Sequence, residues 1–238
     1  MDFPIYLAMT AAEMAKCRSI PPKIAYMACH FSAYGTGISN RPEHLPAGSV
    51  LILNDRTPIH KHDPQLISAQ IAQLMDDLSA AGLLVDFQRP VTEEALEVIR
   101  ALCSLDITLT VTEAFASEFN CDVLLSPAPL HMALQAHAAP WRGRKLWLEL
   151  SRDPEALRLT SQGCAILPGK DMSELTTTHA QENLHCHYQI SALEEQAEFL
   201  LFRTTDDHKS LLQEAEDLGF IGAVGLYQEF QDMFYSST

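Results

Sequence analysis

Two polar side chains lie at the end of an apolar segment, where polar groups are costly. The segment Gly82–Gln88 is predicted to form a buried strand. Successive side chains of a strand point to opposite faces, so Leu84, Asp86 and Gln88 share one face. An Asp and a Gln on an inner face are unfavourable unless they are hydrogen-bonded or used. We predict that they serve a binding or catalytic function, and the alternative is that they merely satisfy each other, Arg89 or the backbone.

Further polar side chains follow other predicted strands. Barrel enzymes assemble their active sites at the carboxyl ends of the strands, because these ends all lie on one side of the barrel. Two carboxylates placed there can act as an acid and a base or nucleophile. Each one taken singly is also expected as a solvated or salt-bridged loop residue. The candidates for such a polar mouth are Asn54, Asp55, Arg56, Arg89, Glu113, Glu149 and Glu229.

Strands and helices alternate along the chain, which indicates a parallel sheet with crossover helices. Asp63 before Pro64 marks the start of a helix that extends to about Ala80. Thr92 is expected to cap the next helix, Glu93–Cys103. The strand candidates are Ile24–Phe31, Val50–Asn54, Gly82–Gln88, Asp106–Thr112, Cys121–Ser126, Lys145–Leu150 and Phe220–Tyr227.

The length and composition suit one sizeable domain. A chain of 238 residues that is 47% hydrophobic has the usual length of a single barrel. We predict one α/β domain over residues 1–238, a (β/α)8 TIM-type barrel. Only seven parallel strands are counted, so either the loop 32–48 holds the eighth or the barrel is incomplete. Residues 152–201 do not follow the alternation of strands and helices, and we expect them to form an insertion packed on the barrel top.

Charge and hydropathy disfavour several classes of function. The net charge of −15 disfavours nucleic acids and anionic membranes as partners, and no apolar stretch approaches the roughly 20 residues of a membrane span. The segment Met1–Pro4 has no basic character, so we expect no signal peptide and a cytoplasmic protein. The six cysteines of the chain are expected to be reduced and mostly buried. No cofactor and no metal site is predicted, although His185 and His187 would share a face on one strand.

The strand with the two polar side chains resembles the signature strand of glycoside hydrolase family 18, the chitinase-like enzymes. That signature reads Asp-Gly-x-Asp-x-Asp-x-Glu. Gly82 matches the Gly of the signature, and Asp86 matches its third Asp. Ala81 stands in place of the first Asp, Leu84 in place of the second, and Gln88 in place of the final Glu. The resemblance implies the barrel fold and gives Asp86 the role of orienting the substrate's acetamido group. The family's proton donor is the final Glu, which is an amide in this chain.

The C-terminal part of the chain is similar to the same family. Phe202–Leu211 contains an aspartate-rich turn with a serine, and after a helix Gly219–Val224 leads into the last strand. The family closes that strand with a Trp under the sugar, where this chain has Tyr227 nearby. The family's Met-x-Tyr-Asp motif has no match, because Ser126–Pro129 stands in its place. The resemblance covers about half of the chain.

The resemblance implies substrate-assisted hydrolysis, in which the Glu protonates the leaving oxygen and the sugar's own N-acetyl oxygen attacks. An amide has no proton to transfer, so Gln88 indicates binding without turnover. We predict a catalytically inactive carbohydrate-binding barrel for N-acetylated glycans, with Tyr34 and Tyr227 as stacking platforms. Two alternatives stay open. One is an active glycoside hydrolase with its acid at Glu113 or Glu149, and the other is a scaffold barrel that binds no sugar.

Overall fold

The computed structural model describes residues 3–17, 19–167, 177–193 and 195–235. The chain divides into two compact units. The barrel unit comprises Met1–Ser126, Gly143–Glu149 and Ile221–Thr238, and the second unit comprises Pro127–Arg142 and Leu150–Phe220.

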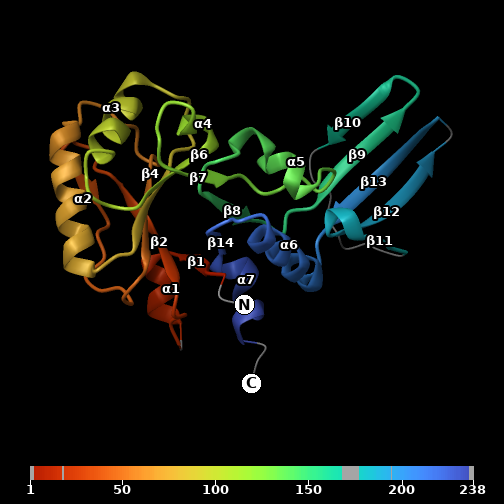
Figure 1. The fold of residues 1–238 in the computed structure, drawn as a ribbon, viewed down its shortest axis with the longest axis horizontal. Coiled ribbons are helices and arrows are strands. Elements are labelled where there is room, and N and C mark those ends of the chain that lie inside the picture. The colour runs from red at the N-terminus through yellow and green to blue at the C-terminus, as the bar shows by residue number, and fades with distance from the viewer. Residues whose placement is uncertain (1–2, 18, 168–176, 194, 236–238) are drawn as a thin grey trace. The chain divides into compact units, whose positions relative to one another are not determined.

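Eight parallel strands close the barrel unit into a ring (Figure 1), which confirms the predicted (β/α)8 fold. Around the ring the order is β1, β14, β8, β7, β6, β5, β4 and β2, and β2 pairs with β1 to complete it. Their bounds are β1 Ile5–Met9, β2 Ile24–Phe31, β4 Val50–Asn54, β5 Gly82–Asp86, β6 Leu109–Thr112, β7 Asp122–Leu125, β8 Leu146–Leu150 and β14 Gly222–Leu226.

The sequence prediction missed the first strand of the barrel. The eighth strand is β1, and the barrel is complete. The loop after β2 holds only the two-residue strand β3 (Ile38–Ser39), which pairs antiparallel with the end of β2 at the margin of the sheet. An eighth strand in the loop 32–48 was therefore the wrong expectation.

Local capping chemistry determines where the barrel helices begin. The Asp63 carboxylate accepts a hydrogen bond from the Gln65 backbone at the start of α2, and the Thr92 hydroxyl accepts one from the Ala95 backbone at the start of α3, as predicted. No helix in the described part of the chain has both the length and the apolarity of a membrane span. The barrel-unit helices are α1 Ala11–Lys16, α2 Pro64–Leu78, α3 Glu93–Leu102, α4 Glu113–Ala116 and α7 Tyr227–Tyr235.

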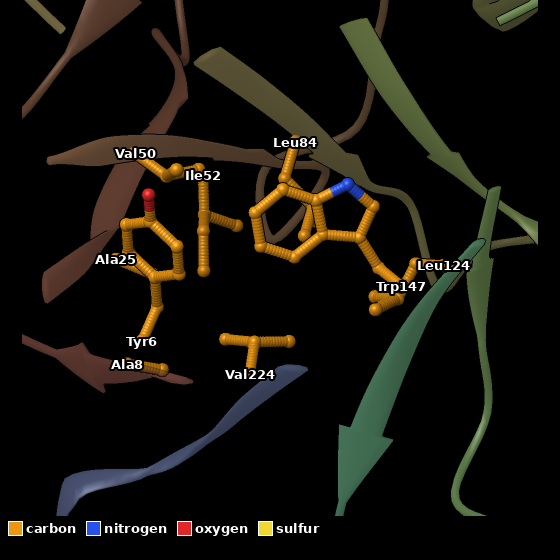
Figure 2. Packing of buried hydrophobic residues seen from close by; sticks show 9 residues of the cluster. All are labelled: Tyr6, Ala8, Ala25, Val50, Ile52, Leu84, Leu124, Trp147 and Val224. Carbon is orange, nitrogen blue, oxygen red and sulfur yellow. The ribbon is translucent and has the colours of Figure 1, made fainter. Parts of the chain in front are cut away.

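The barrel interior is filled by side chains from almost every strand, so it is a packed core. Figure 2 shows the Trp147 indole and the Tyr6 ring surrounded by aliphatic side chains. Leu84 belongs to this cluster. The members are Tyr6, Ala8, Ala25, Val50, Ile52, Leu84, Leu124, Trp147 and Val224.

The second unit is built on an antiparallel sheet of five strands in the order β10, β9, β13, β12 and β11. Residues 155–202 contain the whole sheet, within and just beyond the segment predicted as an insertion. Buried Leu130, Cys186 and Leu201 form its core with half-buried side chains around them. The bounds are α5 Leu134–Ala138, η1 Ala139–Trp141, β9 Glu155–Thr160, β10 Gly163–Leu167, β11 His179–Gln181, η2 Glu182–Leu184, β12 Cys186–Leu193, β13 Gln196–Phe202 and α6 Thr205–Asp217.

His185 and His187, which the sequence suggested would share a strand face, do not share a strand. His185 follows η2 with a left-handed backbone, and only His187 belongs to β12. Each is paired with a carboxylate: His185 Nε2 lies 2.7 Å from Glu214, and His187 Nδ1 lies 2.8 Å from Asp207. Among the residues that the structure describes, no group of three or more His, Cys, Asp and Glu side chains is arranged to hold a metal ion.

We expect Gly222→Ala to lower the free energy of unfolding by about 1–3 kcal/mol, because an added methyl overpacks the barrel core. A Cβ at Gly222 would lie 2.9 Å from the Trp147 ring and 3.1 Å from the Pro4 carbonyl oxygen. Urea denaturation measures the loss. Combining the change with Trp147→Leu should cost less than the sum of the two single losses, because the smaller side chain makes room. Strictly additive losses would contradict this account.

Candidate functional site

Asp86 and Gln88 lie together at the mouth of the barrel, the end where the strands terminate. Asp86 is the last residue of β5, and the Gln88 side-chain amide donates a short hydrogen bond to its carboxylate. Leu84, two residues earlier, points into the barrel core (Figure 2), so Asp86 shares that inward face by alternation. Leu83 and Val85 are buried on the opposite face. A leucine at position 84 suits its place among apolar side chains, where an ionised carboxylate would be costly.

An aromatic row anchors the end of β5 between its two polar side chains. Phe87 is buried, with its ring centroid 5.6 Å from Phe31 and 5.7 Å from Phe115. Such separations are favourable for tilted and edge-to-face ring pairs. Because Phe87 points to the helix side of the strand, the residues before and after it are turned the other way. This alternation positions Asp86 and Gln88 side by side.

A buried carboxylate ties the ends of β4 and β5 together. Asp55 accepts hydrogen bonds from the backbone amides of Gln88 and Arg89, each at 2.9 Å. The Arg89 guanidinium in turn donates to the carbonyl oxygens of Asp55 and Arg56. Asn54 donates to the Met27 carbonyl on β2 at 2.9 Å. Asn54, Asp55 and Arg89, which the sequence suggested as polar residues of the mouth, thus hold the rim of the barrel in place.

Glu149 is the acid that the barrel mouth perturbs most. It lies next to the end of β8, in the barrel unit, and it is only partly accessible to solvent. Burial, followed by the negative charges of Asp86, Glu229 and Glu113, raises the pKa of Glu149 from its ordinary value of 4.5 to about 7. Burial also raises the pKa of Asp86, although the hydrogen bond from Gln88 acts against this effect.

Two hydrogen-bonded pairs at the mouth were not foreseen from the sequence. The Ser126 backbone amide and hydroxyl donate to the Glu113 carboxylate at 3.0 and 2.6 Å. The Gln228 side chain donates to the Glu13 carboxylate at 2.8 Å. Glu113 and Ser126 directly follow the neighbouring strands β6 and β7, whereas Glu13 and Gln228 belong to α1 and α7, the helices that follow the neighbouring strands β1 and β14. The Thr10–Glu13 capping box at the start of α1 was the local signal available for the second pair.

The two tyrosines proposed as stacking platforms differ in their surroundings. Tyr34 lies in the loop after β2 and is 90% exposed. Tyr227 begins α7, one residue beyond the end of β14, and its hydroxyl lies 3.4 Å from the Cys17 sulfur. The contact turns the Tyr227 hydroxyl toward the end of α1. The role of the two rings as stacking platforms stays a prediction.

The mouth therefore combines a carboxyl group that holds its proton near neutral pH with ionisable neighbours and an amide. A protonated carboxyl can donate a hydrogen bond or a proton, whereas an ionised carboxylate can only accept. Sugar hydroxyl and acetamido groups need both kinds of partner. The arrangement suits a neutral, polyhydroxylated ligand better than an anion, because the charges gathered there are negative.

No family model matches the chain, and no curated protein matches it in sequence. Solved structures match its fold. A mutant GH18 chitinase of Cycas revoluta, in complex with (GlcNAc)4, has a TM-score of 0.58 at 10% identity, over 94% of each chain. The spore cortex-lytic enzyme SleL of Bacillus cereus has a TM-score of 0.58 at 12% identity, over 94% of this chain and 70% of its own. The putative sporulation-specific glycosylase ydhD of Bacillus subtilis has a TM-score of 0.53 at 9% identity, over 84% and 90%.

These likenesses establish that the chain has the chitinase-like barrel fold. The fold that the signature strand implied is therefore confirmed. At such low identity the likeness concerns the fold alone, and activity has to be argued from the residues at the mouth.

Proposed function

We propose that this chain binds oligosaccharides of N-acetylated sugars at the mouth of its barrel without cleaving them efficiently. The observation that carries the proposal is the hydrogen-bonded pair of Asp86 and Gln88 at the end of β5. In the signature that this strand resembles, the second position of the pair is the proton donor. An amide at that position can hydrogen-bond a sugar oxygen, but it has no proton to transfer.

The comparisons support binding by a barrel of this kind. The Cycas revoluta structure in complex with (GlcNAc)4 is a mutant chitinase that includes a glutamate-to-glutamine change, so such a barrel can hold the tetramer with that replacement present. In the present chain Gln88 is exposed and Asp86 is partly buried. A ligand can reach the amide, while the carboxylate beneath it is held ready to accept from an acetamido N–H.

Calorimetric titration with (GlcNAc)4 tests the proposal. We expect the wild type to bind, and Asp86→Ala to weaken binding by about 1–3 kcal/mol, which is roughly 5- to 150-fold in Kd, because a hydrogen-bonded partner of the ligand is lost. Glu118→Ala, at an exposed glutamate after α4, is the matched control and should bind like the wild type. Absence of heat from the wild type at millimolar tetramer would favour the scaffold barrel.

The raised pKa of Glu149 favours a second candidate, an active glycoside hydrolase with Glu149 as its acid. A general acid works best when its pKa lies near the working pH, and about 7 satisfies that condition. Glu113 suits the role less well, because its carboxylate is engaged as the acceptor of two hydrogen bonds from Ser126. If the wild type releases reducing sugar from (GlcNAc)4, Glu149→Gln should abolish the release and Glu118→Gln should not. Undiminished release by Glu149→Gln would exclude this candidate.

A further inference from the structure

Two cysteines that are distant in sequence meet at the end of the barrel opposite the mouth. Cys103 directly follows α3, and Cys121 directly precedes β7. In a barrel each helix returns the chain to the amino ends of the strands, so the residues after α3 and before β7 lie at that end. Both side chains line the same pocket of the barrel unit. All six cysteines are free thiols, and Cys103 is exposed while Cys121 is half-buried. The expectation that the cysteines are mostly buried was therefore wrong for this pair.

A pocket of about 280 Å³ opens beside the two thiols, and both cysteines line it. The other polar residues of its wall are Thr108, Asn120, Asp122 and Lys145. The whole pocket belongs to the barrel unit. A small polar molecule can therefore approach the exposed Cys103 from solvent, and the half-buried Cys121 lines the same pocket.

Arg144 fixes the segment that carries the second thiol. Its guanidinium donates to the carbonyl oxygens of Ala116, Phe119 and Cys121. Cys103 is held independently, because its backbone amide continues the hydrogen-bonding pattern of α3 to Ile99. The two cysteines of this pocket thus lie on separately anchored segments, which favours bond formation between them over modification of each one alone.

We propose that Cys103 and Cys121 form a reversible disulfide by exchange with a small disulfide such as oxidised glutathione. Cys103, the exposed thiol, loses its proton and attacks one sulfur of the oxidant, which releases one glutathione thiolate and leaves a mixed disulfide. Cys121 then loses its proton and attacks the Cys103 sulfur, which releases the second glutathione thiolate. Two protein thiols are oxidised, one glutathione disulfide is reduced, and the two protons end on the released thiols.

The electrostatic surroundings favour the disulfide at equilibrium and slow its formation. Burial raises the pKa of Cys103. Burial, the Cys103 sulfur and Asp122 raise the pKa of Cys121 to about 11, against the opposing effect of Arg144. Neither thiolate is stabilised, so ionisation does not stabilise the reduced form of this pair. In strongly oxidising proteins the reduced form is stabilised, and the disulfide is correspondingly disfavoured. Exchange at neutral pH is slow because few thiolates are present.

The closed bond would tie the end of α3 to the start of β7 across the segment 104–120, which contains β6 and α4. A ring of this size restricts the unfolded chain, so the oxidised protein should be more stable. We expect oxidation of the full chain with excess oxidised glutathione at pH 8.5 to raise Tm by about 5 °C over the dithiothreitol-treated protein. Non-reducing peptide mapping should recover the Cys103 and Cys121 peptides joined.

Single serine variants make the test specific. Cys103→Ser and Cys121→Ser should each remove the oxidant-dependent rise in Tm and the joined peptides. Cys164→Ser, at an exposed cysteine of the second unit, is the matched control and should retain both. The proposal is overturned if Cys103 and Cys121 are recovered only as free or separately glutathionylated thiols while Cys164 is modified. It is equally overturned if the rise in Tm survives in Cys103→Ser.

Discussion

Replacing Glu149 with glutamine is expected to raise the free energy of unfolding at pH 8 by about 2 kcal/mol and to leave it nearly unchanged at pH 4. The folded protein raises the pKa of this carboxyl from 4.5 to about 7. Between these values the folded state binds a proton that the unfolded chain has lost, so stability falls as pH rises. The shift corresponds to roughly 3 kcal/mol, and partial exposure to solvent reduces the figure to about 2 kcal/mol.

The sign of this change in the free energy of unfolding depends on whether Glu149 is neutral or ionised in the folded protein. Below about pH 4.5 Glu149 is neutral in both states, so a neutral amide of similar shape changes little. Above about pH 7 the folded protein holds an ionised carboxylate beside Asp86, Glu229 and Glu113, and the amide removes that repulsion. Guanidinium denaturation at several pH values measures the difference. Glu118→Gln, at an exposed glutamate, is the control and should follow the wild type at every pH. Parallel pH profiles for Glu149→Gln and the wild type would contradict the account.

Local signals in the sequence were enough to predict α2, α3 and most strands of the barrel. Asp63 and Thr92 cap α2 and α3 through bonds to residues two or three positions away, so their sites can be identified from short motifs. The strand β1 has no such local signal. Its partners are β14 at the other end of the chain and β2. Closure of the ring through distant pairing is therefore the part of the fold that periodicity could not predict.

The candidate site divides in the same way. Alternation along one strand predicted that Asp86 and Gln88 share a face, and the structure shows them hydrogen-bonded. The rule that polar residues gather after strands identified Glu113 and Glu149 as candidates. Burial of a carboxyl group among like charges depends on how strands far apart in sequence close the barrel. Only the structure therefore shows that Glu149 is the one with the strongly raised pKa.

Changing Gln88 to glutamate is expected to raise the rate of (GlcNAc)4 hydrolysis at least about 100-fold above that of the wild type. A positioned general acid contributes about 10²- to 10⁴-fold, and the lower end is expected because Leu84 and Ser126–Pro129 depart from the family's pattern. The Gln88 amide already reaches Asp86. A protonated carboxyl in its place can donate the same hydrogen bond, and the neighbouring charge favours retention of the proton.

The measurement is release of reducing sugar from (GlcNAc)4 across pH 5 to 8, with binding followed in parallel. Gln88→Met has a similar volume and no proton to transfer, so it should show no gain in rate. Adding Asp86→Asn to Gln88→Glu should remove most of the gain, because the charge that retains the proton and orients the acetamido group is lost. If Gln88→Glu binds the tetramer as the wild type does but cleaves it no faster than Gln88→Met, the glycosidic bond does not lie at this position. The mouth would then have to place its ligand over Glu149 instead, and the loss of hydrolysis in Glu149→Gln becomes the deciding experiment.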